Sequence, residues 1–183
     1  LTKELWQKKI LIVGFGRIGT NLIKKCKGFE MNVYVYDPYV DKKIIEHSGA
    51  KKIENLKDTI KEMDYVSIHS PLTKETKNMF NLEMFKKMKR SSIIINTSRG
   101  GVINEADLNE ALNKNLIFGA GLDVFEKEPP DTNNLLLKNE KVFLSPHVST
   151  FTEECIERMG MEVVQNIIDF FDGKLERSKI VKV

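Results

Sequence analysis

The residues with the clearest chemical meaning are three glycines near the start of the chain and an aspartate 18 residues after the last of them. Gly14, Gly16 and Gly19 follow one apolar run and open a segment with helical spacing, and Asp37 ends a second apolar run. This order of strand, glycine loop, helix, strand and acid is typical of a dinucleotide-binding unit. The alternative is an ordinary glycine turn near a strand-end Asp-Pro turn. The strand before the loop and the acid after it favour dinucleotide binding.

Asp37 also indicates which dinucleotide is bound. A carboxylate at the end of the second strand can accept hydrogen bonds from the adenosine ribose hydroxyls, and it repels the additional phosphate of NADP. The next residues are Pro38 and Tyr39, and neither is a base that would hold that phosphate. The sequence therefore predicts NAD as the cofactor.

Further polar residues follow the other apolar runs. Ser70 comes after the third run, Arg99 after the fourth, the acidic segment 123–129 after the fifth and His147 after the sixth. In an open parallel sheet, ligands bind outside the carboxyl ends of the strands. An arginine, acids and a histidine are thus expected at the cofactor edge. Individually, a lone histidine is most often structural and an acid beside a proline is most often a solvated loop residue.

Short apolar strands alternate with amphipathic helices along the chain, a rhythm that predicts a parallel sheet with right-handed crossovers. We expect strands at 10–13, 33–36, 65–69, 93–96, 117–122 and 142–145. We expect helices near 18–28, 41–48, 55–63, 81–88, 105–114 and 152–172. The stretch 126–140, with paired prolines and paired asparagines, indicates a long loop. The predicted fold class is α/β, a doubly wound parallel sheet of the Rossmann type.

Composition limits the possible functions. The 183 residues are 41% hydrophobic and 30% charged, which is ordinary for a globular protein. The net charge of +3 comes from interleaved bases and acids, so no nucleic-acid partner is expected. No apolar stretch approaches the length of a membrane span, and no signal peptide is visible. Cys26 and Cys155 lack metal-site spacing, so no metal is expected and a cytoplasmic location is indicated.

Four segments in order carry a resemblance over nearly the whole chain. The chain resembles the D-isomer-specific 2-hydroxyacid dehydrogenases, and the joint occurrence of their signatures is specific. The matching segments are GFGRIG at 14–19, NTSRGG at 96–101, GLDVFEKEP at 121–129 and SPH at 145–147.

The resemblance implies a catalytic arginine, glutamate and histidine at Arg99, Glu128 and His147. The glutamate is the one directly before a proline, which is Glu128 and not Glu126. The planar guanidinium of Arg99 would bind a substrate carboxylate at two points. His147 would give a proton to the carbonyl oxygen as hydride arrives, and Glu128 would hold the imidazole.

The resemblance also implies cofactor contacts beyond the glycines and Asp37. Arg17 and Ile18 would offer backbone N–H groups to the pyrophosphate. Thr97 and Asp123 would lie against the nicotinamide ribose and carboxamide. Ser70 and Pro71 would form a wall near the same ring, and His69 is expected in the core or in the cofactor wall.

Family members carry a second, substrate-covering lobe, most of which precedes the glycine motif. This lobe is expected to be absent here, so that the chain is a partial enzyme with residues 1–152 as an NAD-binding domain. Residues 153–183 would form a C-terminal helix and tail that return to the absent lobe. A homodimer is expected, because the long loop 126–140 would otherwise expose Leu135, Leu136 and Leu137.

The function implied is hydride transfer between NAD(H) and a pair of a D-2-hydroxy acid and a 2-oxo acid. The phosphoglycerate or glycerate dehydrogenase group is favoured by segment 93–129. The alternative is a non-enzymatic, NAD-sensing interaction module like the C-terminal binding protein corepressors, which resemble this family. Intact Arg99, Glu128 and His147 favour chemistry.

Overall fold

The structure is a computed structural model that describes residues 3–180. The chain divides into two compact units, the first ending at His147 and the second beginning at Val148. The predicted domains 1–152 and 153–183 include residues 1–2 and 181–183, which lie outside the described residues.

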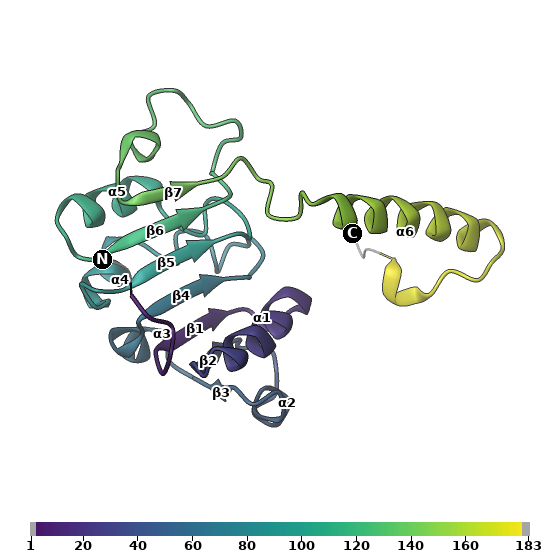
Figure 1. Ribbon diagram of the computed structural model, residues 1–183, viewed down its shortest axis with the longest axis horizontal. Coiled ribbons are helices and arrows are strands. Elements are labelled where there is room, and N and C mark those ends of the chain that lie inside the picture. Colours follow the sequence, from purple (N-terminus) through teal and green to yellow (C-terminus); the bar gives the residue numbers. More distant parts are fainter. Residues whose placement is uncertain (1–2, 181–183) are drawn as a thin grey trace. The chain divides into compact units, whose positions relative to one another are not determined.

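Within the described residues, the first unit is built on one sheet of seven parallel strands in the order β3-β2-β1-β4-β5-β6-β7 (Figure 1). The strands are β1 (Lys9–Val13), β2 (Asn32–Tyr36), β3 (Lys51–Lys52), β4 (Tyr65–Ile68), β5 (Ile93–Asn96), β6 (Gly119–Leu122) and β7 (Val142–Leu144). The six predicted strands are confirmed to within two residues at each end. The short edge strand β3 was not predicted, because two lysines carry no apolar signal.

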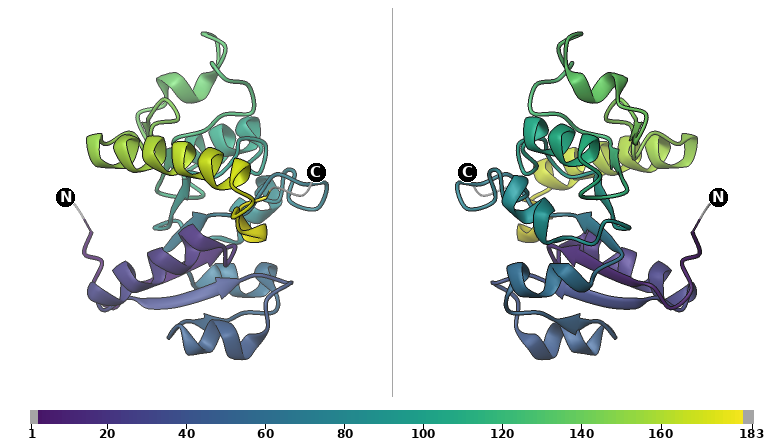
Figure 2. Two further views of the ribbon diagram at one scale, coloured as in Figure 1. Left: turned by 90° about the vertical axis from the view of Figure 1, so that its right-hand side faces the viewer. Right: turned by 90° about the vertical axis from the view of Figure 1, so that its left-hand side faces the viewer.

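Helices cover both faces of this sheet, as Figure 2 shows from two sides. On one face, α1 (Arg17–Gly28) and α2 (Lys42–His47) pack on Ile10, Ile12, Val33 and Val35. The opposite face is covered by α3 (Leu56–Thr59), α4 (Leu82–Lys87) and α5 (Glu105–Asn113). The predicted α/β doubly wound fold is therefore confirmed. The predicted helix 55–63 is shorter, because α3 continues as the 3-10 turn η1 (Ile60–Glu62).

Side-chain caps set where most of the helices begin. The cap residues accept a backbone N–H bond at the starts of α2, α3, α4, α5, the 3-10 turn η2 (Leu135–Lys138) and α6 (Glu153–Phe171); they are Asp41, Asn55, Asn81, Asn104, Asn134 and Thr152. Such caps satisfy N–H groups that have no partner inside a helix. Helix α1 differs, because it starts after Gly16 without a side-chain cap.

The expected loop 126–140 contains η2, and its three leucines differ from expectation. Leu136 is 1% exposed and lies in the core, and Leu137 packs against that core. Leu135 alone of the three is strongly exposed, at 67%. The expectation that all three leucines need an external cover was wrong, because the capped turn folds two of them onto the first unit.

The second unit contains α6 and the 3-10 turn η3 (Arg177–Lys179). No described residue of α6 is buried, although the helix carries an apolar face. The exposed apolar residues of α6 include Ile156, Val163, Ile167, Phe170 and Phe171. In the described part of the chain, no helix is long and apolar enough to cross a membrane.

Candidate functional site

The three glycines meet three different spatial demands. Gly14 has φ +103°, and a β-carbon there would lie 2.7 Å from the carbonyl oxygen of His69, so the turn passes directly beside β4. A β-carbon at Gly19 would overlap the carbonyl of Gly14, so helix α1 packs closely on its own loop. A β-carbon at Gly16 would meet open space. Gly16 therefore leaves the backbone approachable from outside, as a pyrophosphate requires.

The start of α1 suits an anion. Arg17 and Ile18 form its first turn and are exposed, and that turn contains no acidic residue. Without a side-chain cap, the first backbone N–H groups and the positive end of the helix dipole face outward. This end of α1 follows β1 at the point where the strand order reverses, between β1 and β4.

Asp37 lies against the glycine loop. Its Oδ2 accepts a hydrogen bond from the backbone N–H of Phe15 at 2.8 Å, and its Oδ1 accepts one from the N–H of Tyr39 at 2.9 Å. A carboxylate has about four acceptor positions. Asp37 can therefore support the loop and still accept bonds from ribose hydroxyls.

Two buried polar atoms at the end of β4 have no hydrogen-bond partner among the described residues. They are Nδ1 of His69 and Oγ of Ser70, which is 8% exposed. Nε2 of His69 lies 2.8 Å from Oγ of Ser67. Burial lowers the pKa of His69, so the ring is neutral near pH 7. Pro71 follows on the surface, and its carbonyl accepts a bond from Oγ1 of Thr76.

The arginine loop is shaped by Asn96, which ends β5 and is 1% exposed. Its Oδ1 accepts bonds from the N–H and the hydroxyl of Ser98 at 3.0 and 2.8 Å, and its Nδ2 donates to the carbonyl of Arg99 at 2.9 Å. These bonds turn the chain after Thr97 and leave Arg99 exposed. Gly100 then lies so close to Phe125 that a β-carbon would overlap its carbonyl.

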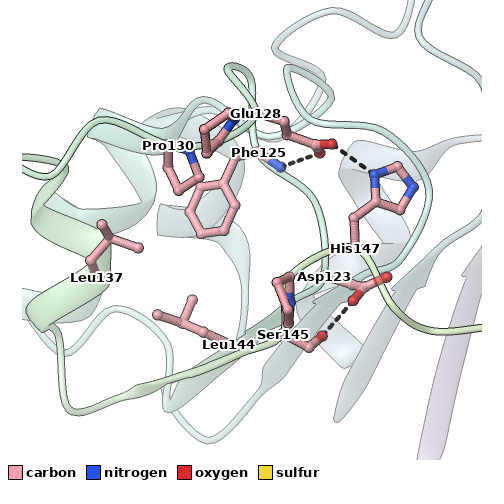
Figure 3. Close-up of a pocket in the computed structure, with 10 residues that line it drawn as sticks. Asp123, Phe125, Glu128, Pro130, Leu137, Leu144, Ser145 and His147 are labelled. Carbon is pink, nitrogen blue, oxygen red and sulfur yellow. Dashed lines mark hydrogen bonds and ion pairs between the residues drawn. The ribbon is translucent and has the colours of Figure 1, made fainter. Parts of the chain in front are cut away.

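Glu128 and His147 form a pair. Oε2 of Glu128 lies 2.7 Å from Nδ1 of His147, and Oε1 accepts the N–H of Phe125 at 3.0 Å (Figure 3). The bond with His147, then the bond with Phe125, lowers the pKa of Glu128 below its usual value, and the nearby charge of Arg99 adds to this. An ionised carboxylate only accepts hydrogen bonds, so Nδ1–H donates and Nε2 is left as the outer ring nitrogen.

His147 itself has an unusual backbone. Its φ is +56°, a region that side chains other than glycine rarely adopt, and its N–H donates to the carbonyl of Asp123 at 2.8 Å. Asp123 is 3% exposed, and its Oδ1 accepts the hydroxyl of Ser145 at 2.5 Å. Asp123 thus connects the end of β6 to the histidine turn after β7. A cavity of about 380 Å³ adjoins Glu128 and His147, and it is lined mainly by apolar residues such as Phe125, Leu137 and Leu144 (Figure 3).

The structure places the predicted site residues in two neighbouring groups at the carboxyl edge of the sheet. The first group surrounds the β1–β4 switch point and contains Gly14, Gly16, Arg17, Ile18, Gly19, Asp37, Ser70 and Pro71. The second group follows β5, β6 and β7 and contains Thr97, Arg99, Asp123, Glu128 and His147. Sequence reasoning missed Asn96 and Ser145 as supports. Their signal is a polar residue directly at the end of an apolar strand.

These features fit a dinucleotide on physical grounds. The open approach at Gly16 and the uncapped α1 suit a diphosphate, and the orphaned hydroxyl of Ser70 is a buried polar group that a bound partner would satisfy. No cluster of three or more His, Cys, Asp or Glu side chains that could hold a metal occurs within residues 3–180.

Fold and site together define a dinucleotide-binding domain of the Rossmann type. Comparison with known families gives the particular one: the chain belongs to the family "D-isomer specific 2-hydroxyacid dehydrogenase, NAD binding domain", which it matches over residues 1–149. The predicted cofactor, NAD, is thereby confirmed.

Relatives and solved structures agree with this family. The chain is 37% identical over 177 residues to the D-3-phosphoglycerate dehydrogenase of Archaeoglobus fulgidus, covering 97% of this chain and 33% of that protein. It is 42% identical over 175 residues to the glyoxylate reductase of Thermococcus litoralis, covering 96% and 52%. An NAD-complexed D-isomer specific 2-hydroxyacid dehydrogenase from Lactobacillus delbrueckii ssp. bulgaricus superimposes with a TM-score of 0.87 at 26% identity, covering 98% and 58%.

The chain spans about a third to a half of the length of these relatives. Their names are those of enzymes, which favours the enzymatic interpretation over the NAD-sensing alternative.

Proposed function

We propose that this chain is the cofactor domain of an oxidoreductase that transfers hydride between NAD(H) and a D-2-hydroxy acid/2-oxo acid pair. The observation that carries the proposal is the Glu128–His147 contact of 2.7 Å, next to the Arg99 loop. A histidine oriented by a carboxylate is a common general acid and base. Bound NADH supplies the hydride.

Each of the three side chains has a defined task. Arg99 binds the substrate carboxylate and orients the reacting carbonyl, because its guanidinium matches a carboxylate at two points. His147 donates a proton from Nε2 to the carbonyl oxygen during reduction and takes it back during oxidation. Glu128 fixes the ring through Nδ1, so that Nε2 faces the reaction.

We assign the substrate to the phosphoglycerate or the glycerate/hydroxypyruvate group. Relatives named D-3-phosphoglycerate dehydrogenase and glyoxylate reductase match at similar identity, and their substrates share the carboxylate beside the reacting carbon. Arg99 and His147 address that shared core. The groups that distinguish these acids bind elsewhere.

The test uses the protein at its full natural length. His147→Ala lowers kcat for reduction of a 2-oxo acid by at least about a hundredfold while NADH binding is kept, since general acid catalysis contributes about 10²–10⁴. Arg99→Lys chiefly impairs binding of the 2-oxo acid. His47→Ala is the matched control, because His47 is exposed on α2, which follows β2, and the strand order separates β2 from β7 and His147 by four strands. Near-parent rates in the His147 or Arg99 variant remove that residue from its role.

We also propose that residues 1–152 act as the NAD-binding domain and that segment 153–183 packs on a substrate-binding lobe. The apolar face of α6 supports this, because a stable helix buries such a face. Polar replacement of Val163 and Ile167 lowers the melting temperature of the full-length protein. An unchanged melting temperature contradicts the packing role.

The further proposals are a homodimer, a cytoplasmic location, and the absence of nucleic-acid and membrane partners. Exposed Leu135 and the long loop support the dimer, and the interleaved charges support the absence of nucleic acid. Sedimentation velocity at concentrations on the order of 10 µM tests the dimer. A monomer under these conditions refutes the dimer.

A further inference from the structure

One carboxylate outside the predicted catalytic set contacts both ends of the segment that carries Glu128. Glu105 is the first residue of α5. Its Oε1 accepts the backbone N–H of Glu126 at 2.6 Å, and its Oε2 accepts Nδ2 of Asn134 at 2.7 Å. These partners lie 21 and 29 residues further along the chain. The carboxylate therefore closes the segment 126–134 into a loop at its base.

This segment has few other means of keeping its shape. Residues 126–129 are exposed, so burial does little to fix them. Apart from the Glu128–His147 contact itself, the ion pair that this segment forms, between Lys127 and Asp131, lies within the segment and does not connect it to the sheet. Charge-assisted hydrogen bonds such as those of Glu105 are about twice as strong as neutral ones. Glu105 is thus the principal polar connection between this loop and α5 among the described residues.

The connection reaches the reactive pair through two consecutive amides. The N–H of Phe125 donates to Glu128, and the next N–H, of Glu126, donates to Glu105. Gly100, the residue after Arg99, packs against the peptide that joins Phe125 and Glu126. A shift of the 125–126 peptide therefore moves both the carboxylate that holds His147 and the support of the arginine loop.

Asn134 completes the arrangement in a fixed orientation. Its Oδ1 accepts the N–H of Leu136 at 3.0 Å, so its Nδ2 is the atom turned toward Glu105. Leu136 is in the core. The far end of the loop is thus tied both to Glu105 and to the apolar interior.

We propose that Glu105 is a positioning residue that, together with Asn134, holds Glu128 against His147. The inference deepens the proposed hydride transfer and rests on it. The competing explanation is that Glu105 only stabilises the N-terminus of α5 as a first-turn acid. The two explanations differ in what happens when the donor and acceptor of the contact are exchanged.

The experiment compares Glu105→Gln, Asn134→Asp and the double variant in the full-length protein. Glu105→Gln turns an amide NH₂ toward that of Asn134, and Asn134→Asp places two carboxylates face to face. The double variant restores one donor and one acceptor, and the new carboxylate can still accept the N–H of Leu136. Glu110→Gln is the matched control, since Glu110 lies on the same helix and forms its ion pair with Lys114, also at that helix.

Two readouts are measured: kcat for glyoxylate with NADH, and hydrogen exchange of the Phe125 and Glu126 amides. Each single variant lowers kcat by about tenfold or more and speeds exchange at both amides, because misplacement by about 1 Å costs up to a hundredfold. In the double variant, kcat and the exchange rates return to within about threefold of the parent values. The effects of the two single changes are then not additive, as expected for residues in contact. The NADH affinity of these variants stays within about twofold of that of the parent, and so do the kcat and the amide exchange rates of the control Glu110→Gln.

Parent-like kcat and exchange in Glu105→Gln overturn the proposal, and so does a double variant no better than the worse single variant. A parent protein without turnover of any 2-oxo acid refutes the proposed function instead. In that case the exchange data alone decide: restored protection in the double variant supports the positioning contact, and unrestored protection overturns it.

Discussion

Replacing Gly100 by alanine places a β-carbon inside the contact between the loop that carries Arg99 and the segment that carries Glu128. The added carbon would overlap the carbonyl of Phe125 and approach the amide of Glu126, well inside the 3.0 Å that such atoms keep. Gly100 does not share the positive φ of Gly101, +76°, so its backbone permits alanine. The cost is therefore steric. Both neighbours are backbone atoms that cannot rotate away, so the two loops must separate.

Overpacking of this kind costs about 1–3 kcal/mol of unfolding free energy. A separation on the order of 1 Å between Arg99 and Glu128 lowers kcat by about a hundredfold. Urea unfolding and steady-state kinetics measure the two effects. Gly28→Ala is the control, because a β-carbon at this helical position meets nothing within 4 Å, and it should stabilise the fold by about 0.5–1 kcal/mol. Gly100→Ala with unfolding free energy within about 0.5 kcal/mol of the parent and unchanged kcat would refute the steric reasoning.

Three further results are expected. The parent chain binds NADH over NADPH by at least about tenfold, roughly 1.4 kcal/mol, and Asp37→Ala narrows that gap; nicotinamide fluorescence measures both affinities, and equal affinities in the parent contradict the assignment. Burial lowers the pKa of His69 in the folded protein. As the pH falls below about 6.5, the unfolded chain therefore protonates His69 while the folded protein keeps it neutral, and the free energy of unfolding declines until the pH reaches the folded-state pKa. His69→Gln flattens this decline in urea titrations across that range, whereas a decline of unchanged steepness assigns it to other groups. Asn96→Ala lowers the unfolding free energy by about 2 kcal/mol, because it removes three hydrogen bonds whose partners on Ser98 and Arg99 are only partly exposed to water. A loss below about 0.5 kcal/mol speaks against the role of Asn96 in the loop.

Most of the fold could be predicted because strands buried on both faces read as apolar runs. β4 and β5 are examples, and their ends were placed within one residue. The edge strand β3 pairs through Lys51 and Lys52 on one side only, so its sequence carries no such run. The turn η2 escaped prediction for another reason: its burial depends on α5 and β7, which lie beside it in space.

Some residues of the candidate site could be predicted from the sequence, and others could not. Residues within one motif, such as Gly14 and Asp37, are predicted from their spacing, because a single strand–helix–strand unit places them. The Glu128–His147 pair was assigned through family resemblance, since the two residues are 19 positions apart and meet only when β6 and β7 are aligned. Glu105 carries no local signal at all. Its position suits an ordinary first-turn acid, and its partners become visible only in three dimensions.

The hydrogen bond from Phe15 to Asp37 has a consequence for how cofactor preference can change over time. Asp37, which we propose discriminates between the two dinucleotides, also accepts a hydrogen bond from the glycine loop and so supports that turn. A lineage that drifts toward the phosphorylated cofactor cannot simply discard the carboxylate without loosening that turn. It needs a neutral acceptor of similar size at position 37 and a new base nearby, and Tyr39, 85% exposed, occupies a place where a base could be added. With Asp37 in the role proposed for it, a change of cofactor preference therefore requires two coordinated replacements and not one.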